Sequence, residues 1–271
     1  MKLALVQMCG GRAAARNLAD AEAMIREAAG AGASVIATPE VTNIVERDAD
    51  RVMALLKSEA EDPAPARFSA LASELGVDLL AGSFALLGED GRAVNRSMLF
   101  GPDGAVKARY DKIHMFDVEL GASERYRESA TYQPGERAVL TEAAGAPLGL
   151  TICYDVRFAA LYRRLAQAGA AMITVPAAFT RPTGRAHWEV LLRARAIETG
   201  SFILAPAQGG RHEDGRNTWG RSMVIGPWGD VIAALDHDAP ALVYAELDLS
   251  QVERARSRIP ALGPDRAFKG P

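Results

Sequence analysis

The pattern of apolar and polar positions at the start of the chain predicts a strand, a helix and a second strand. Residues 2–8 are rich in strand-forming residues, and residues 34–38 form a short apolar run. Between them an apolar residue recurs at helical spacing over 17–29, with Asn17 as the expected N-cap and Gly30 at the expected end. A short apolar strand is typical of a sheet that is covered on both faces.

The same two patterns continue along the chain and predict an α/β fold. Further helices are predicted near 48–60, 66–75, 157–168 and 186–200, and further strands near 78–84, 94–100, 105–110, 148–153, 171–175, 202–206, 221–226, 230–235 and 242–247. In the last helix, Val190, Ala194 and Ile197 predict a stripe that faces the core. Trp188 and Trp228 are interpreted as packing residues.

The two ends of the chain resemble each other. AGASVIATPE (31–40) matches AGAAMITVPA (168–177), and FGPDGAV (100–106) matches IGPWGDV (225–231), in the same order. Common turn chemistry could produce such matches by itself. The sharper interpretation is two related halves, which predicts a four-layer α-β-β-α sandwich with an internal pseudo-two-fold repeat. No linker separates the halves, so we expect one domain over 1–271.

Composition narrows the classes of function. The net charge is −3 with both signs interspersed, so the basic stripe of a nucleic-acid-binding protein is missing. The two cysteines do not provide a disulfide framework, and no apolar run reaches the length of a membrane span. The apolar start is too short for a signal peptide. We therefore expect a cytoplasmic protein that binds neither nucleic acid nor membrane.

Cys153 is the strongest candidate for chemistry. It ends a predicted buried strand directly before a predicted helix, which is where open α/β sheets bind ligands. Nearby backbone N–H groups would lower the pKa of its thiol and could bind an oxyanion. The alternative is a small buried hydrophobe, as most free cysteines are. Cys9 also follows a strand, but nothing around it supports a role.

Glu40 and Lys112 are candidate partners. Glu40 follows the buried run SVIATP, where a carboxylate is costly unless it is paired or used as an acid or base. The alternative for Glu40 is a loop carboxylate that caps the next segment. The local sequence around Lys112 is by itself typical of a surface lysine. His114 invites a Cys–His interpretation, but it lacks the flanking pattern. The histidines are too far apart for a typical zinc site, so no metal is expected.

Together these segments resemble the nitrilase superfamily of carbon–nitrogen hydrolases. The matching motifs are TPE around Glu40, YDKIHMFD around Lys112 and GLTICYDVRF around Cys153, followed by VPAAF, TGRAHWEVLLRARAIET, MVIGPWGDVIA and LDLSQVERARSRIP. The resemblance covers nearly the whole chain and implies a Glu–Lys–Cys triad and the α-β-β-α sandwich. TGRAHWEVLLRARAIET and APAQGGRHEDGRNTWGRSMV resemble the Nit branch, its deaminated glutathione amidases more than its ω-amidases.

The resemblance implies amide hydrolysis through a thioester on Cys153, without a cofactor. Glu40 would move protons, while Lys112 and the backbone N–H of Tyr154 would stabilise the oxyanion. A second glutamate is expected between the lysine and the cysteine. Glu128 in RYRES fits better than Glu119 in VELGASE.

The implied substrate is a small anionic amide, a peptide-like 2-oxo acid of the N-(4-oxoglutaryl) type. Phe179 and Thr180 are expected to line its pocket, and Arg157 and Arg181 to bind it, with Arg185 and Arg211 as further cations near the rim. Alternatives are an ω-amidase, an N-carbamoyl hydrolase, acyl transfer to an amine, and an interaction module without activity. A homodimer or larger homo-oligomer is implied by the family alone.

Overall fold

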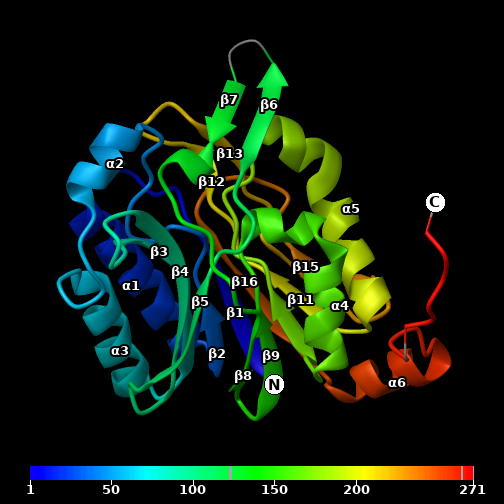
Figure 1. Cartoon of the computed structure of the whole chain (residues 1–271). Coiled ribbons are helices and arrows are strands. Elements are labelled where there is room, and N and C mark those ends of the chain that lie inside the picture. Colours follow the sequence, from blue (N-terminus) through cyan, green and yellow to red (C-terminus); the bar gives the residue numbers. More distant parts are fainter. Residues whose placement is uncertain (122–123, 264, 271) are drawn as a thin grey trace.

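The computed structural model describes residues 1–121, 124–263 and 265–270, and its centre is a pair of six-stranded mixed sheets (Figure 1). In order across the first sheet, the strands are β16 (Ala241–Glu246), β1 (Lys2–Gln7), β2 (Val35–Ala37), β3 (Asp78–Leu87), β4 (Ala93–Phe100) and β5 (Val106–Asp111). Across the second they are β15 (Val231–Ala234), β14 (Met223–Ile225), β11 (Phe202–Ala205), β10 (Met172–Thr174), β9 (Ala146–Leu150) and β8 (Val139–Ala143).

The two sheets have the same topology, which confirms the internal repeat. In each sheet three neighbouring strands run parallel, β1, β2 and β3 in the first and β9, β10 and β11 in the second. An antiparallel strand flanks the first of the three, and two antiparallel strands follow the third. The sequence matches therefore correspond to β2 with β10, and to the β4–β5 turn with the β14–β15 turn.

Helices cover the outer faces of both sheets and complete four layers (Figure 1). α1 (Ala14–Gly30) and α3 (Pro63–Leu75) lie on the first sheet, and α4 (Ala159–Gln167) and α5 (Arg181–Thr199) on the second. Successive residues of β1 point to opposite faces. Leu3 and Leu5 pack against the second sheet, whereas Ala4 and Val6 pack under the helices. The expected α/β sandwich is confirmed.

Remaining elements are short and include several that the sequence patterns do not predict. α2 (Ala49–Leu55) lies over a small cluster of its own, and α6 (Ser250–Arg258) follows β16. Two hairpins lie outside the sheets, β6–β7 (Asp117–Gly121 and Glu124–Arg127) and β12–β13 (Gly209–Arg211 and Asn217–Trp219). The 3-10 turns η1 (Glu128–Ala130) and η2 (Cys153–Arg157) carry candidate site residues. The hairpins, β8 and α6 were not predicted.

Some predicted boundaries are wrong for physical reasons. α1 begins at Ala14, so Asn17 is not its N-cap. The Asn17 amide is buried and bonds Gly11 N, Gly11 O and Asn43 O, each at 2.8 Å. The helix predicted over 48–60 ends at Leu55, and α5 begins at Arg181, well before residue 186. β9 ends at Leu150, so Cys153 lies in the turn after the strand.

The predicted core stripe of α5 is also wrong. Val190 is 67% exposed and Ile197 54% exposed, and Trp228 in the β14–β15 turn is 54% exposed beneath Arg258. The buried face instead carries Trp188, as predicted, together with Leu192, Arg195, Ala196 and Thr199. Arg195 pairs with Glu198, donates Nε to Val156 O at 2.8 Å and lies over the ring of Tyr162, so its charge is accommodated.

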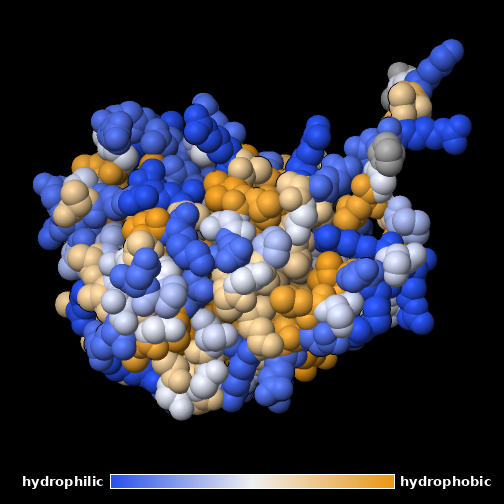
Figure 2. Space-filling model, turned by 90° about the horizontal axis from the view of Figure 1, so that it is seen from below, coloured by the Kyte–Doolittle hydropathy of each residue, from blue (hydrophilic) through white to orange (hydrophobic). Residues whose placement is uncertain are grey.

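The end of the molecule opposite the β6–β7 hairpin has a mixed surface. Figure 2 shows hydrophobic residues interspersed with hydrophilic ones over this face, and residues 265–270 extending away from the body. None of the helices in the described ranges is long and apolar enough to cross a membrane. The cavity and the buried charged residues lie at the opposite end of the molecule, next to the β6–β7 hairpin (Figure 1).

Candidate active site

Lys112, just after β5, lies at the centre of a buried cluster of charges. Its Nζ donates to Glu40 Oε1 and to both carboxylate oxygens of Glu128, each at 2.9 Å. The side chain is only 2% exposed. Burial disfavours its charged form, but Glu128 and Glu40 outweigh that effect and raise the pKa of Lys112 well above its usual value. The ammonium is therefore charged at neutral pH.

Glu40 follows β2 and is held from two sides. Its Oε1 also accepts from Asn95 Nδ2 at 3.0 Å, and its backbone carbonyl accepts from Gln208 Nε2 at 3.0 Å. Asn95 lies on β4, two strands away from β2, so the sheet itself sets the distance between them. Asn95 Oδ1 is buried and has no protein partner among the described residues.

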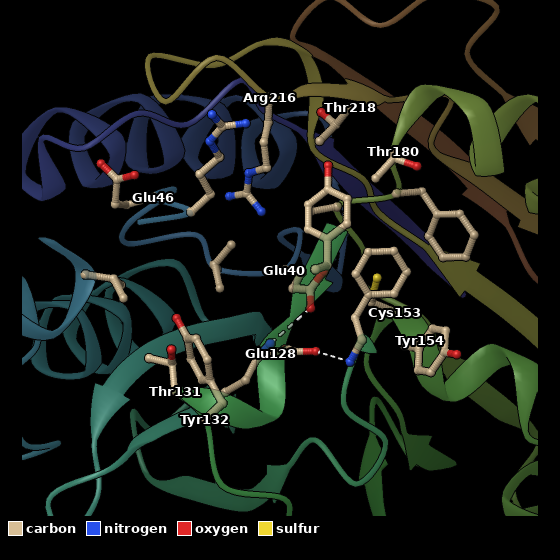
Figure 3. Close-up of a pocket in the computed structure, with 18 of the residues that line it drawn as sticks. Glu40, Glu46, Glu128, Thr131, Tyr132, Cys153, Tyr154, Thr180, Arg216 and Thr218 are labelled. Atoms are coloured by element: carbon tan, nitrogen blue, oxygen red, sulfur yellow. Dashed lines mark hydrogen bonds between the residues drawn. The ribbon is translucent and has the colours of Figure 1, made fainter. Parts of the chain in front are cut away.

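Cys153 reaches the same cluster from the second sheet. Its thiol interacts with the Glu40 carboxylate and with the backbone N–H of Ala178. Its own backbone N–H donates to Pro176 O at 2.9 Å, which ties the turn after β9 to the end of β10. Figure 3 shows Glu40, Glu128 and Cys153 close together in the pocket. The structure thus brings Glu40, Lys112, Glu128 and Cys153 together.

Backbone strain marks the two strand ends that meet here. Cys153 has φ +47° and Val41, directly after Glu40, has φ +49°. Left-handed conformations are unfavourable for residues with a Cβ, especially a β-branched one, and persist only where the surroundings impose them. At Cys153 this conformation turns the chain sharply from strand to 3-10 turn and places the sulfur in the pocket.

The protonation of Cys153 differs from the expectation. Burial raises the pKa of its thiol well above the usual value, and Glu40 raises it further. Lys112 and the Ala178 N–H act in the opposite direction without outweighing them. The predicted lowering of this pKa is wrong because the thiol is fully enclosed beside a carboxylate.

Between the two candidate second glutamates, the structure places Glu128 at the cluster. Besides binding Lys112, Glu128 Oε2 accepts from Phe116 N at 2.6 Å. Glu119 lies on the β6–β7 hairpin, 54% exposed, and pairs with Arg125 and Arg127.

Asp155 connects the lysine segment to the cysteine turn. Its carboxylate is fully buried and accepts from Tyr110 Oη at 2.6 Å, from Ile152 N at 2.9 Å and from His114 N at 3.0 Å. His114 Nδ1 also lies 2.7 Å from Asp155 Oδ1, and its ring stacks on Phe158. His114 therefore supports the turn and is not the base of a Cys–His pair. No sequence pattern indicated Asp155.

The cluster opens into a cavity of about 820 Å³. Tyr154, Phe179, Thr180 and Arg181 line it, as the sequence predicts. Arg157 lies outside the lining, with its guanidinium over the rings of Tyr154 and Phe179 and next to His187. Arg185 and Arg211 are also outside it. Residues that the sequence analysis missed include Asn95, Phe116, Tyr126, Tyr132 and Arg216.

Within the described ranges, no group of three or more His, Cys, Asp and Glu side chains is arranged to hold a metal ion. The chemistry that these side chains support is acyl transfer: a thiol beside a carboxylate, with a buried ammonium and backbone N–H groups nearby.

Comparisons with known proteins agree with this arrangement. Residues 2–257 match the carbon–nitrogen hydrolase family. The deaminated glutathione amidase of Yersinia enterocolitica is 39% identical over 97% of this chain and 92% of its own. The human deaminated glutathione amidase is 39% identical over 90% of this chain and 76% of its own.

Solved structures share the fold. The C. elegans NitFhit protein has a TM-score of 0.90 at 32% identity; the match covers 98% of this chain but only 65% of that longer one. Saccharomyces cerevisiae Nit3, a member of branch 10 of the nitrilase superfamily, has a TM-score of 0.88 at 27% identity, with 99% and 97% covered. An amidase from Nesterenkonia sp. AN1, with acrylamide added to its active-site cysteine, has a TM-score of 0.79 at 26% identity, with 96% and 98% covered. The chain therefore belongs to the carbon–nitrogen hydrolase family and is an amidase of the nitrilase superfamily.

Proposed function

We propose that this amidase hydrolyses deaminated glutathione, an anionic peptide-like 2-oxo acid, through a thioester on Cys153. The observation that carries the chemistry is the contact of the Cys153 thiol with Glu40, beside the ammonium of Lys112. Support for the substrate comes from the bacterial and human relatives of that name, each 39% identical. Arginines around the cavity suit an anionic ligand.

Acylation begins with the neutral thiol. Glu40 takes the thiol proton as Sγ attacks the amide carbon, so the proton moves only as the S–C bond forms. Negative charge develops on the amide oxygen, facing Lys112 Nζ and the backbone N–H of Tyr154. Glu40 then gives its proton to the leaving nitrogen, the C–N bond breaks, and an amine departs.

Deacylation reverses these roles with water. Glu40 accepts a proton from the attacking water, the C–O bond forms, and the C–S bond breaks to release the acid. The proton on Glu40 returns to Cys153. Glu128 holds Lys112 in place throughout and neutralises part of its charge, so that the ammonium serves the oxyanion without burying an uncompensated charge.

Steady-state rates on a substrate panel test this proposal. We expect a higher kcat/KM on deaminated glutathione than on 2-oxoglutaramate, with products identified by mass spectrometry in the presence and absence of an added amine. Cys153→Ala should lower turnover by at least about 10⁴-fold while leaving the fold intact. A preference for 2-oxoglutaramate would indicate an ω-amidase, and substantial activity in Cys153→Ala would contradict the mechanism.

A further inference from the structure

The proposed substrate needs a fixed cation in addition to the catalytic residues. Its acyl part ends in a carboxylate and stays attached to Cys153 after the amine has left. Burying a carboxylate costs several kcal/mol unless a cation or hydrogen-bond donors meet it. Lys112 is already shared between two glutamates, so another residue must supply this charge. The arginines that line the cavity are Arg47, Arg125, Arg127, Arg181 and Arg216.

Four of these arginines are poorly placed for a buried carboxylate. The side chains of Arg125 and Arg127 are 66% and 57% exposed and pair with Glu119 on the β6–β7 hairpin. Arg181 is 51% exposed and pairs with Asp238. Arg47 is exposed just before α2. An exposed guanidinium is strongly hydrated and contributes little net binding energy.

Arg216 differs because a buried carboxylate holds it. Its side chain is 19% exposed, and its Nε donates to Asp214 Oδ2 at 2.8 Å. The Asp214 side chain is fully buried, and Oδ1 accepts from Arg216 N at 2.9 Å. Asp214 therefore engages only Nε. Among the described residues, no protein acceptor contacts the two terminal nitrogens, the pair that binds a carboxylate bidentately.

The segment that carries Arg216 is anchored at several points. His212, at the start of the β12–β13 turn, is buried, with Nδ1 2.7 Å from Gly10 O and Nε2 2.7 Å from Thr218 Oγ1. Glu213 Oε2 accepts from Arg12 N at 3.0 Å. A cation held in this way loses little conformational freedom when a ligand binds, so more of the interaction energy appears as affinity.

Arg216 also faces the catalytic cluster. Figure 3 shows its side chain extending from the rim of the pocket toward Glu40. The phenol of Tyr132 responds to both the cluster and Arg216: burial and Glu128 raise its pKa, while the positive charge of Arg216 acts to lower it. We propose that Arg216, oriented by Asp214, binds the carboxylate of the acyl part of the substrate and thereby selects amides of dicarboxylic acids. This inference rests on the proposed function.

Two amides of equal chain length test the role of Arg216. Glutaramate carries a carboxylate on its acyl side, whereas n-valeramide has a methyl group there, and release of ammonia reports both reactions. Arg216→Gln should lower kcat/KM at least about 50-fold more on glutaramate than on n-valeramide. Arg216→Lys keeps the charge but loses the two-pronged geometry, so it should lie between Arg216→Gln and the wild type.

The control is Arg254→Gln, which removes a surface arginine paired with Asp248 on the far side of the molecule. It should change neither rate by more than about twofold. Equal losses on the two amides in Arg216→Gln, or a wild type that does not prefer glutaramate, would overturn the role of Arg216. If the ratio responds as expected but deaminated glutathione is not hydrolysed, the proposed substrate fails while the carboxylate site stands.

Discussion

The two cysteines occupy corresponding places in the two halves of the chain. Cys9 follows β1 and Cys153 follows β9, and each of these strands is the first of three parallel strands in its sheet. Both thiols have a raised pKa, and burial is the largest cause in each case. The backbone topology therefore provides two similar strand ends, of which one has the surroundings of a nucleophile.

The difference lies in what the rest of the chain places beside each sulfur. Cys9 Sγ contacts Arg211 O at 3.5 Å and lies 4.0 Å from His212 Nδ1, a nitrogen already bonded to Gly10 O. No carboxylate accepts from the Cys9 thiol among the described residues. Beside Cys153 lie Glu40, which follows β2 of the first sheet, and Lys112, which follows β5 of the same sheet. In this chain, the strand end that forms a candidate active site is the one where a carboxylate and an ammonium lie beside the thiol.

Among the residues that surround Cys153, removal of the Lys112 cation should have the largest effect. Lys112→Met should lower kcat about 100- to 1000-fold, because the oxyanion loses a donor. It should also destabilise the protein by about 3–5 kcal/mol, because Glu40 and Glu128 are left buried without their cation. Urea unfolding and steady-state kinetics measure the two effects.

Lys107→Met is the matched control, since Lys107 pairs with Asp78 on the same sheet away from the cavity. It also leaves a buried carboxylate without its cation, so it should destabilise the protein too, but it should leave kcat within about twofold. Near-normal turnover in Lys112→Met would make the lysine a structural residue only.

Removing the amide that holds Glu40 should have a smaller effect. Asn95→Leu takes away the donor to Glu40 Oε1 and should lower kcat/KM about 10- to 100-fold. Ser97→Ala, two residues along β4, loses a buried hydrogen bond to Ala81 O without touching the site. If both variants lose activity equally, the loss in Asn95→Leu comes from a disturbance of β4 and not from the missing hydrogen bond to Glu40.

The thiol of Cys153 should stay protonated in the free enzyme. A raised pKa means that the proton is lost only at high pH, so thiolate absorbance at 240 nm should be absent near neutrality and appear only above pH 9, the ordinary value. The difference spectrum between the wild type and Cys153→Ala isolates this signal. A thiolate step below that pH would show a resting thiolate–lysine ion pair instead.

The smallest effect should come from the Cys9 end. Cys9→Ser changes a half-buried thiol that has no base, so kcat/KM on any accepted amide should stay within about twofold. A large loss of activity without loss of stability would mean that the strand ends at Cys9 and Cys153 are both functional.

The sequence predicts the catalytic cluster better than the residues around it. Glu40 and Cys153 each follow an apolar strand, at the edge where an α/β sheet binds ligands. These strands belong to different sheets, so it is the resemblance to the nitrilase superfamily that predicts their meeting. Asn95 lies inside a strand, where a buried amide looks like an ordinary polar interruption. Arg216 lies in a hairpin turn whose position depends on contacts of His212 with Gly10 and of Glu213 with Arg12, which are distant in the sequence.

The α5 stripe failed because helical periodicity identifies apolar positions but does not say which face is covered. The covered face includes Arg195, which pairs with Glu198 on the same helix and also contacts Val156 O and the ring of Tyr162. The contacts with Val156 and Tyr162 come from another segment, and no local pattern signals them. The raised pKa of Cys153 also depends on tertiary contacts, since burial is its largest cause and a carboxylate from the other sheet adds to it.

The proton acceptor and the sulfur belong to different sheets, joined through the packing of Leu3, Leu5 and their neighbours against the second sheet. The turnover rate therefore depends on the separation of the two sheets. It responds to displacements that are too small to disturb any strand or helix. In a denaturant titration, activity should disappear before the far-ultraviolet circular dichroism changes, as the layers loosen while each still holds its own hydrogen bonds.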